Sequence, residues 1–411
     1  MTKIRALFVG LFCVVVLATN MVASVAGPPV VVVGACYTQY PPPLHYTTIQ
    51  AGVTAVASGG TVYVCPGPPY PEQVIVNKPL SIIGLKIGNA DSVVIAAPST
   101  WVTTPDPDGS SNIAAQLLVD GTPGPVNISN LTVDGNNNLP GCGANPVGIY
   151  YRNSSGTASY VNAINQNVPG GCSLGFGIFV ESWLGVSNVT VSNSYVANYS
   201  KNGIVARHQG TTATFTINKV FGQGPTTANA ENGIEFAYGA TGSATSNTVM
   251  DNVYLPPGTY AGSGIIVYDS QNVTSQGNVI GNNQYGITYT SATAGGADGG
   301  TIKSNSVYST HWLDGIDVCS NNHAVTSNTV IGSDESGIHL DASCTSSGTG
   351  NTVTSNVISA ACAGILDDSP GLNGVFTSNF FNTVTNIVAT GGACTPPLSP
   401  VNGMQQAKVS P

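Results

Sequence analysis

The chain has 411 residues, enough for one large domain or two ordinary ones, with 10 Lys and Arg residues against 19 Asp and Glu residues. The formal net charge of −9 excludes a protein that binds nucleic acid through a basic patch. Intrinsic disorder is also excluded, because 42% of the residues are hydrophobic and only 7% are charged.

The first 26 residues have the pattern of a secretion signal. Lys3 and Arg5 precede an apolar run over residues 6–18, and Ser24-Val25-Ala26 has the form of a cleavage site. We therefore expect cleavage near Ala26 and export of the mature chain. The apolar run is shorter than the roughly 20 residues of a membrane span, and no later stretch is long and apolar enough, so we expect no span.

Residues 27–46 are expected to form a lead segment, with the folded domain running from residue 47 to residue 393. Near its start, Ile49, Val53 and Val56 recur at helical spacing, which predicts a short amphipathic helix. Gly59 and Gly60 end it, and "TVYVCPG" begins the first strands. Residues 394–411 are polar and rich in Pro, and we expect them to form a flexible tail.

A repeat runs through most of the chain. Gly-Ile occurs nine times between residues 148 and 365, at intervals of 22 to 31 residues. Each unit holds short β-branched runs separated by Gly, Asn, Ser or Thr, and none holds a helix-length periodic segment. Propeller blades need about 40 residues, so a unit of this length favours one coil of a parallel β-helix, with about 12 coils in all. Asparagines at equivalent positions of stacked coils predict hydrogen-bonded ladders.

The segment "YTTIQAGVTAVASGGTVYVCPGPPYPEQVIVNKPLSIIG" over residues 46–84 supports this architecture. It resembles the entry to the right-handed parallel β-helices of the pectate lyase-like superfamily. In that superfamily a capping helix leads into a "PGxYxE" segment, which Pro66-Gly67 and Tyr70-Pro71-Glu72 match loosely. The resemblance implies an all-β, single-stranded right-handed parallel β-helix with a short N-terminal capping helix.

Strand alternation predicts which side chains point away from the core. With each Ile of Gly-Ile inward, two outward columns follow. The first is Tyr150, Phe179, Val205, Glu235, Ile266, Thr288, Asp317, His339 and Leu366. The second is Arg152, Glu181, Arg207, Ala237, Tyr268, Thr290, Cys319, Asp341 and Asp368.

Arg152, Glu181 and Arg207 are expected to stack in alternating sign on neighbouring coils. The plain interpretation is a surface ladder of salt bridges, each worth little. The functional interpretation is a clamp for the carboxylates of uronic acids, since a guanidinium binds a carboxylate bidentately. Tyr150 and Phe179 beside it would stack on sugar rings or would be ordinary aromatics.

An acidic cluster is the sharper signal. Residues 314–368 hold seven of the 19 acids, and three of the five histidines lie in or beside the same stretch. Like charges about 4.8 Å apart on stacked strands push at least one pKa upwards, which chains tolerate where a metal or a reaction uses it. Neighbouring coils can supply the carboxyl separations of either a retaining or an inverting glycosidase.

"WLDGID" at residues 312–317 resembles the N-T-D-G-I-D motif of polygalacturonase-type glycosidases, with Asp314 and Asp317 in the acid positions. "GSDESGI" is similar to the D-D motif of the next coil, although its acids lie one residue further from Gly-Ile. The G-H-G and R-I-K motifs are missing. The resemblance implies hydrolysis with Asp314 or Asp317 as general acid, Glu335 or Asp341 activating water, and His339 tuning them.

Other functions stay open. A β-elimination lyase needs a cation, often Ca²⁺ held by acids, and an Arg or Lys base such as Arg207. The acids could also hold a structural Ca²⁺, the one cofactor that the sequence suggests. A non-catalytic secreted or surface protein that binds carbohydrate is the alternative to an enzyme. In each case a polysaccharide is the expected partner.

The cysteines indicate disulfides. Cys13 lies in the predicted signal, and eight remain, an even number with no CxxC spacing. This spacing argues against a zinc site. We expect neighbours to pair in order, as 36–65, 142–172, 319–344 and 362–394.

Overall fold

The computed structural model describes residues 27–36, 44–86, 93–106, 109, 111–136, 140–168, 174–183, 185–255, 260–360, 363–374, 376–383, 385–389 and 408–409. The predicted signal therefore lies outside the described residues. In the part that is described, no helix has the length and apolar character needed to cross a membrane.

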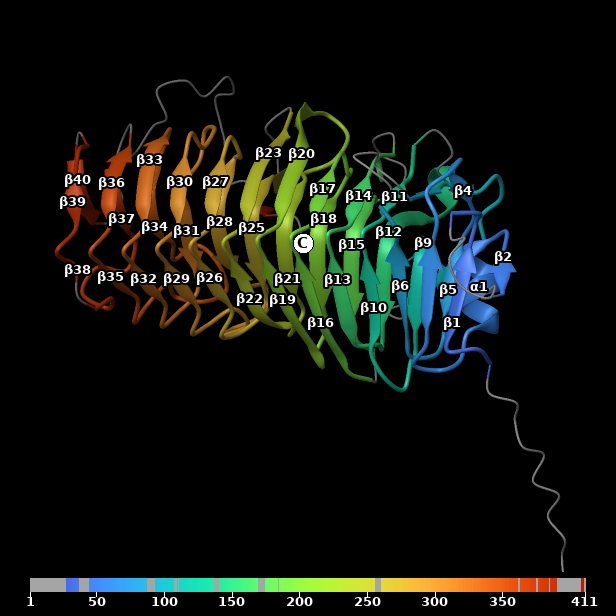
Figure 1. Ribbon diagram of the computed structural model, residues 1–411. Coiled ribbons are helices and arrows are strands. Elements are labelled where there is room, and N and C mark those ends of the chain that lie inside the picture. Colours follow the sequence, from blue (N-terminus) through green and yellow to red (C-terminus); the bar gives the residue numbers. More distant parts are fainter. Residues whose placement is uncertain are drawn as a thin grey trace, which may run out of the picture.

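Short strands form three long parallel sheets that run the length of the molecule (Figure 1). The first sheet contains, in spatial order, β2 (His45–Tyr46), β1 (Val30–Val33), β3 (Thr61–Val64), β6 (Leu80–Gly84), β10 (Val126–Ser129), β13 (Gly156–Ser159), β16 (Ser187–Ser192), β19 (Thr211–Thr216), β22 (Thr241–Thr245), β26 (Thr274–Gln276), β29 (Thr301–Lys303), β32 (Ala324–Thr326), β35 (Thr352–Thr354) and β38 (Phe376–Thr377). The second contains β4 (Tyr70–Pro71), β7 (Val94–Ala96), β11 (Thr132–Asp134), β14 (Asn162–Ile164), β17 (Tyr195–Ala197), β20 (Lys219–Thr226), β23 (Thr248–Tyr254), β27 (Val279–Gly281), β30 (Ser306–Tyr308), β33 (Thr329–Ser333), β36 (Val357–Ala360) and β39 (Phe380–Phe381). The third contains β5 (Val74–Val76), β9 (Asn112–Asp120), β12 (Asn145–Arg152), β15 (Phe176–Glu181), β18 (Asn202–Arg207), β21 (Asn232–Ala237), β25 (Ser263–Tyr268), β28 (Tyr285–Thr290), β31 (Ile316–Cys319), β34 (Ser336–Leu340), β37 (Ala363–Asp367) and β40 (Thr385–Ala389).

A few elements lie outside this plan. Strand β8 (Thr104–Pro105) pairs antiparallel with β9, and η1 (Gly141–Gly143) is a turn of 3₁₀ helix. Strand β24 (Tyr260–Ala261) pairs with β41 (Lys408–Val409), so these two residues of the predicted tail contact the middle of the chain. Strand β1 lies within the predicted lead segment and extends the first sheet beyond β3.

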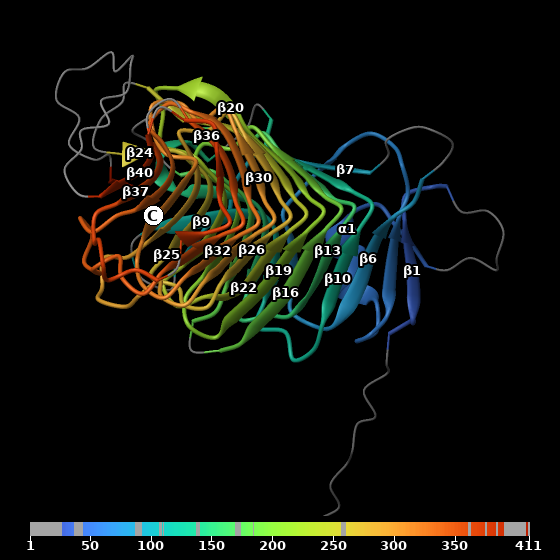
Figure 2. The same ribbon diagram turned by 90° about the vertical axis from the view of Figure 1, so that its left-hand side faces the viewer.

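Each coil contributes one strand to each sheet, as the repeat predicts. Figure 2 shows the coils stacked one behind another along the axis. The Gly-Ile units lie in the third sheet, where Ile149, Ile178 and Ile204 occupy equivalent positions of adjacent strands. Ile and Val side chains from all three sheets fill the interior as one apolar column. The expected parallel β-helix is confirmed.

The glycine of Gly-Ile is required by close approach between coils. A Cβ on Gly177 would lie 2.6 Å from the carbonyl oxygen of Gly203 and 2.3 Å from a methyl group of Val196. The same clash recurs at Gly203 against Gly233. None of the described Gly-Ile glycines has a positive φ, so a turn conformation does not account for them. Packing between coils is therefore the reason for the repeated glycine.

An asparagine ladder runs inside the corner between the first and second sheets. The backbone N–H of Asn247 donates to Asn278 Oδ1 at 2.9 Å, and that of Asn278 donates to Asn305 Oδ1 at 3.0 Å. The same contact recurs along Asn218, Asn247, Asn278, Asn305, Asn328, Asn356 and Asn379. Each step satisfies a buried backbone donor, so the expected ladder is confirmed.

Helix α1 (Ile49–Ala55) lies at the N-terminal end of the solenoid (Figure 1). Thr48 caps it by accepting a hydrogen bond from Ala51 N at 3.2 Å. The carboxyl of Glu72 accepts from Ile49 N at 2.7 Å and Gln50 N at 2.9 Å, which satisfies two donors of the first turn. The predicted helix is present, and its role as a cap stays a prediction.

Two predicted disulfides lie wholly within the described residues and are present. They are Cys36–Cys65 and Cys319–Cys344. Cys142 is also disulfide-bonded, while its expected partner Cys172 and the expected pair Cys362–Cys394 involve residues outside the described ones.

Candidate functional site

The two predicted outward columns of the third sheet are in register. Tyr150 pairs with Phe179, Thr288 with Asp317 and Asp317 with His339. The side chains of the first column are nevertheless buried along its whole length. Tyr150, Phe179 and Val205 of this column lie in one of two further apolar clusters outside the main core, which accounts for the burial of these three side chains.

Tyr150 and Phe179 belong to one of these clusters. Their rings stack with centroids 4.9 Å apart, and Phe176 packs on Phe179 at 5.2 Å. Both side chains are at most 1% exposed. Stacking on a sugar would therefore require the residues that cover them to move apart.

Arg152, Glu181 and Arg207 occupy the adjacent positions that the sequence predicts, but they do not pair with one another. Arg152 binds Asp120 bidentately at 2.6 and 2.8 Å, and this hydrogen bonding raises the pKa of Arg152. Arg207 contacts Glu235 at 3.2 Å. Among the described residues no ion pair joins Glu181 to either arginine, so the expected ladder is replaced by separate pairs.

Glu181 is fully buried and is bound from two other sides. Its carboxyl contacts the ring nitrogen Nδ1 of His208 at 2.7 Å and accepts a hydrogen bond from the hydroxyl of Tyr150. A buried carboxyl needs such partners, because desolvation without them is costly. The charged groups of the proposed clamp for uronate carboxylates are therefore already paired with other protein groups.

His339 is the centre of the predicted acidic cluster. Its Nδ1 lies 3.1 Å from Asp314 Oδ2, and its Nε2 lies 3.2 Å from Asp368 Oδ2. Burial disfavours the charged ring, but the two carboxyls outweigh it and raise the pKa of His339 well above its usual value. A raised pKa favours the ring with a proton on both nitrogens, the form that donates to both acids.

Asp314 is held in place by the next coil. Its Oδ1 accepts from Ser336 N at 3.1 Å and from the Ser336 hydroxyl, while its Oδ2 faces His339. Asp341 accepts from Ser343 N at 2.7 Å and from the Ser343 hydroxyl at 3.0 Å. Both acids are buried and fixed by neighbouring groups.

Asp317 and Glu335 behave differently from Asp368. Asp317 is 4% exposed, and its Oδ1 has no hydrogen-bond partner among the described residues. Burial, with the nearby Asp341, raises the pKa of Asp317 well above its usual value. Burial likewise raises the pKa of Glu335, which is partly exposed, to about 8, with Asp314 adding to the effect.

Asp368 is the most accessible acid that contacts His339, with 29% of its side chain exposed. The hydrogen bond from His339 lowers the pKa of Asp368. One face of the third sheet thus holds carboxyls whose pKa is raised next to one whose pKa is lowered. This combination is typical of a pair that performs acid–base chemistry.

The structure brings together all five residues that the sequence proposes as catalytic: Asp314, Asp317, Glu335, His339 and Asp341. Sequence reasoning placed Asp368 in the cluster without giving it a role, and it missed Ser336. The signal for Asp368 was its place in the second outward column, one coil beyond Asp341. Nothing in the sequence marked Ser336 as the residue that fixes Asp314.

A metal ion is a further way to use these groups. Ligand atoms of Asp314, Asp317 and His339 lie within 4.8 Å of one another, as do those of His339, Asp341 and Asp368. Both sets share His339, whose two nitrogens already face carboxyls. Calcium takes oxygen ligands only, so this histidine does not suit it. Calcium binding by the acids stays a prediction.

Comparisons with known proteins bear on the fold. A family model described as "Right handed beta helix region" matches residues 115–297. No curated protein matches the chain. Among solved structures, the A-module of the mannuronan C-5 epimerase AlgE4 of Azotobacter vinelandii is similar, with 16% identity and a TM-score of 0.56 over 84% of this chain and 95% of that one.

Two further structures are more distant. The periplasmic alginate epimerase AlgG has 13% identity and a TM-score of 0.48, over 80% of this chain and 84% of that one. The DFA-IIIase of Arthrobacter chlorophenolicus A6, without its lid, has 16% identity and a TM-score of 0.45, over 82% and 89%. The family model and the first structure agree with the sheet topology, and the chain has the right-handed parallel β-helix fold.

Proposed function

We propose that this chain acts on a polysaccharide and hydrolyses its glycosidic bonds at the acidic cluster of the third sheet. The observation that carries the proposal is the opposite pKa shift of two accessible acids beside His339. The pKa of Glu335 is raised to about 8, whereas that of Asp368 is lowered. Where the surroundings move the pKa values of two carboxyls in opposite directions, the group with the raised pKa can act as the acid and the other as the base.

The chemistry follows from these protonation states. Glu335 donates its proton to the oxygen of the leaving sugar as the bond from that oxygen to the anomeric carbon breaks. Asp368 accepts a proton from a water molecule whose oxygen bonds to the same carbon. His339 keeps Asp368 ionised and oriented, and Asp314 holds the imidazole ring.

This assignment narrows the roles expected from the sequence. Asp314 is fully engaged by Ser336 and His339, so it acts as a positioning residue. Asp341 is tied into its own turn by Ser343, which makes it a poor base. Asp317 remains the second candidate acid, because burial raises its pKa and so favours the protonated form.

A lyase or epimerase that removes a proton from a uronate is the second candidate. One observation favours it: the imidazolium of His339 is a cation that could neutralise the carboxylate of the sugar, although two acids already share it. The similar A-module is named a mannuronan C-5 epimerase. Elimination leaves an unsaturated uronate that absorbs in the ultraviolet, whereas hydrolysis leaves only new reducing ends.

The test is a panel of pectate, alginate and neutral glycans incubated with wild-type protein, Glu335→Gln and Asp368→Asn. We expect wild type to release reducing ends without unsaturated products, and each variant to lose at least about 99% of the rate. Unchanged rates in both variants would place the chemistry elsewhere. Binding of a glycan without cleavage, without an unsaturated product and without inversion at C5 of a uronate would support the non-catalytic alternative.

We also propose that the protein is exported and that residues 1–26 are removed. Two disulfides within the described residues support an oxidising compartment. N-terminal sequencing of the secreted protein should begin near Gly27. An uncleaved N-terminus on protein recovered from the cytoplasm would contradict the proposal.

Helix α1 is proposed to cover the first coil, because Gly52 lies against Val31, Val33 and Val62 of the first sheet. An uncovered end of stacked strands invites pairing with other chains. Gly52→Leu would clash there, since even a Cβ would lie 2.8 Å from Val33. We expect this variant to aggregate. A monomeric variant of wild-type stability would argue against the cap.

A further inference from the structure

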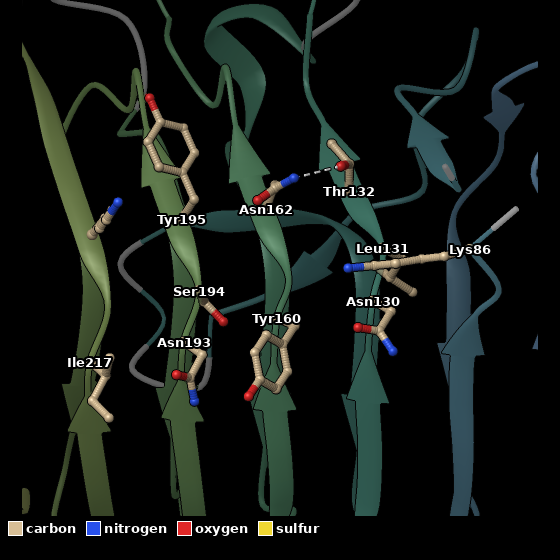
Figure 3. Close-up of a pocket in the computed structure, with 11 residues that line it drawn as sticks. Lys86, Asn130, Leu131, Thr132, Tyr160, Asn162, Asn193, Ser194, Tyr195 and Ile217 are labelled. Atoms are coloured by element: carbon tan, nitrogen blue, oxygen red, sulfur yellow. Dashed lines mark hydrogen bonds between the residues drawn. The ribbon is translucent and has the colours of Figure 1, made fainter. Parts of the chain in front are cut away.

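A second surface, far from the acidic cluster, has the character of a ligand site. It is a groove of about 410 Å³ at the corner between the first and second sheets, and Figure 3 shows its lining side chains. Lys86 follows β6 at one end of the lining, and Lys219 begins β20 at the other. The strands β6, β10, β13, β16 and β19 are successive neighbours, so the groove crosses five coils, or roughly 19 Å.

The charge of this groove is opposite to that of the chain. Among the described residues its lining contains two lysines and no acid, although the protein carries 19 acids and only 10 cations. Both lysines are exposed, and neither ammonium group has an ion pair or a hydrogen bond within the described part of the chain. An anionic ligand would therefore meet two cations that no group among the described residues neutralises.

Two corner residues in the groove are unusual for their backbone. From β10 to β38 each coil turns this corner through a residue with positive φ, and most of these coils use Asn, Ser or Gly there. In the groove the same place is taken by Tyr160, with φ of 53°, and by Ile217, with φ of 57°. Bulky and β-branched residues are strained in this region. Both are exposed, by 59% and 57%, so burial does not compensate the strain. Uncompensated strain of this kind is typical of binding sites.

The rest of the lining matches the chemistry of a sugar chain. Tyr160 and Tyr195, from neighbouring coils, present largely exposed rings that offer flat apolar faces. Between them lie side-chain amides, including Asn162, whose Nδ2 donates to Thr132 Oγ1 at 3.0 Å. Aromatic faces with amides beside them suit the apolar faces and hydroxyls of sugars. Two well-separated lysines suit a sparse row of carboxylates, whereas a nucleic acid would be repelled by the net charge of −9.

We propose that this groove binds a linear oligosaccharide that carries uronate carboxylates, with Lys86 and Lys219 contacting its charges and Tyr160 and Tyr195 contacting its rings. The site is separate from the proposed catalytic cluster, which lies on the third sheet between β31 and β37. It deepens the proposed function by naming the substrate class, but its binding does not depend on catalysis. Such a groove holds the polymer on one face while another face reacts with it.

The test uses the full chain carrying Glu335→Gln, so that no substrate is consumed. Calorimetric titration with an oligogalacturonate of about ten sugars is compared with a neutral cello-oligosaccharide of equal length. We expect the charged probe to bind more tightly than the neutral one, and we expect added salt to weaken the binding of the charged probe. Lys86→Gln with Lys219→Gln should weaken binding about tenfold, because two partly exposed ion pairs are lost. Lys303→Gln, which removes an exposed charge on β29, is the matched control and should change nothing.

A second variant separates binding from folding. Tyr160→Asn introduces a residue type that other coils use at this corner, so it should raise the thermal stability. It should also lower the affinity for the charged probe several-fold. The proposal is overturned if the charged probe does not bind, if the neutral probe binds equally well, or if the lysine pair and Tyr160 variants bind like their parent. Any of these results would leave the cleavage assay, and thus the proposed catalysis, untouched.

Discussion

Replacing Glu335 by Gln is expected to stabilise the fold and abolish catalysis at once. Burial raises the pKa of Glu335 from 4.5 to about 8. At pH 7 the unfolded chain holds this carboxyl ionised, while the folded chain holds it protonated. Such a group contributes its full stability below pH 4.5 and progressively less as the pH rises towards 8. Gln resembles the protonated form and does not ionise in the unfolded chain.

The size of the effect follows from these two pKa values. Each pH unit between 4.5 and 8 costs the folded state about 1.4 kcal/mol, so the penalty at pH 7 is at most about 3.4 kcal/mol. Water reaches part of the side chain and screens the penalty. We therefore expect Glu335→Gln to raise the free energy of unfolding by about 1–2 kcal/mol at pH 7 and by nothing at pH 4.

Denaturant unfolding at both pH values measures this difference. Asp334→Asn is the matched control, because the new side chain can still accept the hydrogen bond from Trp312 N, which is 2.8 Å long in the wild type. The same samples are assayed for glycan cleavage, which we expect Glu335→Gln alone to lose. A stability gain that is equal at pH 4 and pH 7 would refute the burial argument. Retained cleavage would refute the role of Glu335 as the acid.

Three further outcomes can be checked. The rate of cleavage should follow a bell-shaped pH profile, with its alkaline limb near pH 8 from Glu335 and its acid limb below the ordinary Asp value of 3.8 from Asp368; steady-state rates over this range measure it. Asn278→Ala should lower the free energy of unfolding by about 3 kcal/mol, because it leaves several buried ladder groups unpaired. A melting temperature equal to that of the wild type would show that the ladder does not stabilise the fold. Replacing Cys36 and Cys65 by Ala should destabilise the folded chain by about 3–4 kcal/mol, since their separation of 29 residues closes a long loop. Equal denaturant midpoints with and without reductant would contradict the predicted contribution of the disulfide.

The stacking of the chain could be predicted from the sequence because it repeats. One dipeptide, Gly-Ile, marks the same place in successive coils, and strand alternation then assigns neighbours such as Asp317 and His339. Partners beyond the backbone register could not be predicted. Arg152 turns back to Asp120 on the preceding strand, whereas the sequence placed it beside Glu181 on the following one. Both acids lie within reach, and only the packing around the long side chain decides between them.

The burial of the two outward columns could not be predicted from the sequence either. A strand pattern indicates which side chains point away from the solenoid, but not what lies over them. Tyr150 and Phe179 point outward and are still enclosed by a second apolar cluster. Burial has a consequence at the acidic cluster too, since it is the main cause of the raised pKa of Asp317 and Glu335.

The asparagine ladder also fixes a regular spacing along the molecule. Every step from Asn218 to Asn379 repeats one hydrogen-bonding pattern, so the coils advance by an equal pitch of about 4.8 Å. Adding or removing one whole coil would leave that pattern intact and would move the lysine groove relative to the acidic cluster by a single pitch. The spacing between the place where a polymer is held and the place where it reacts is thus set in integer steps, by the number of coils.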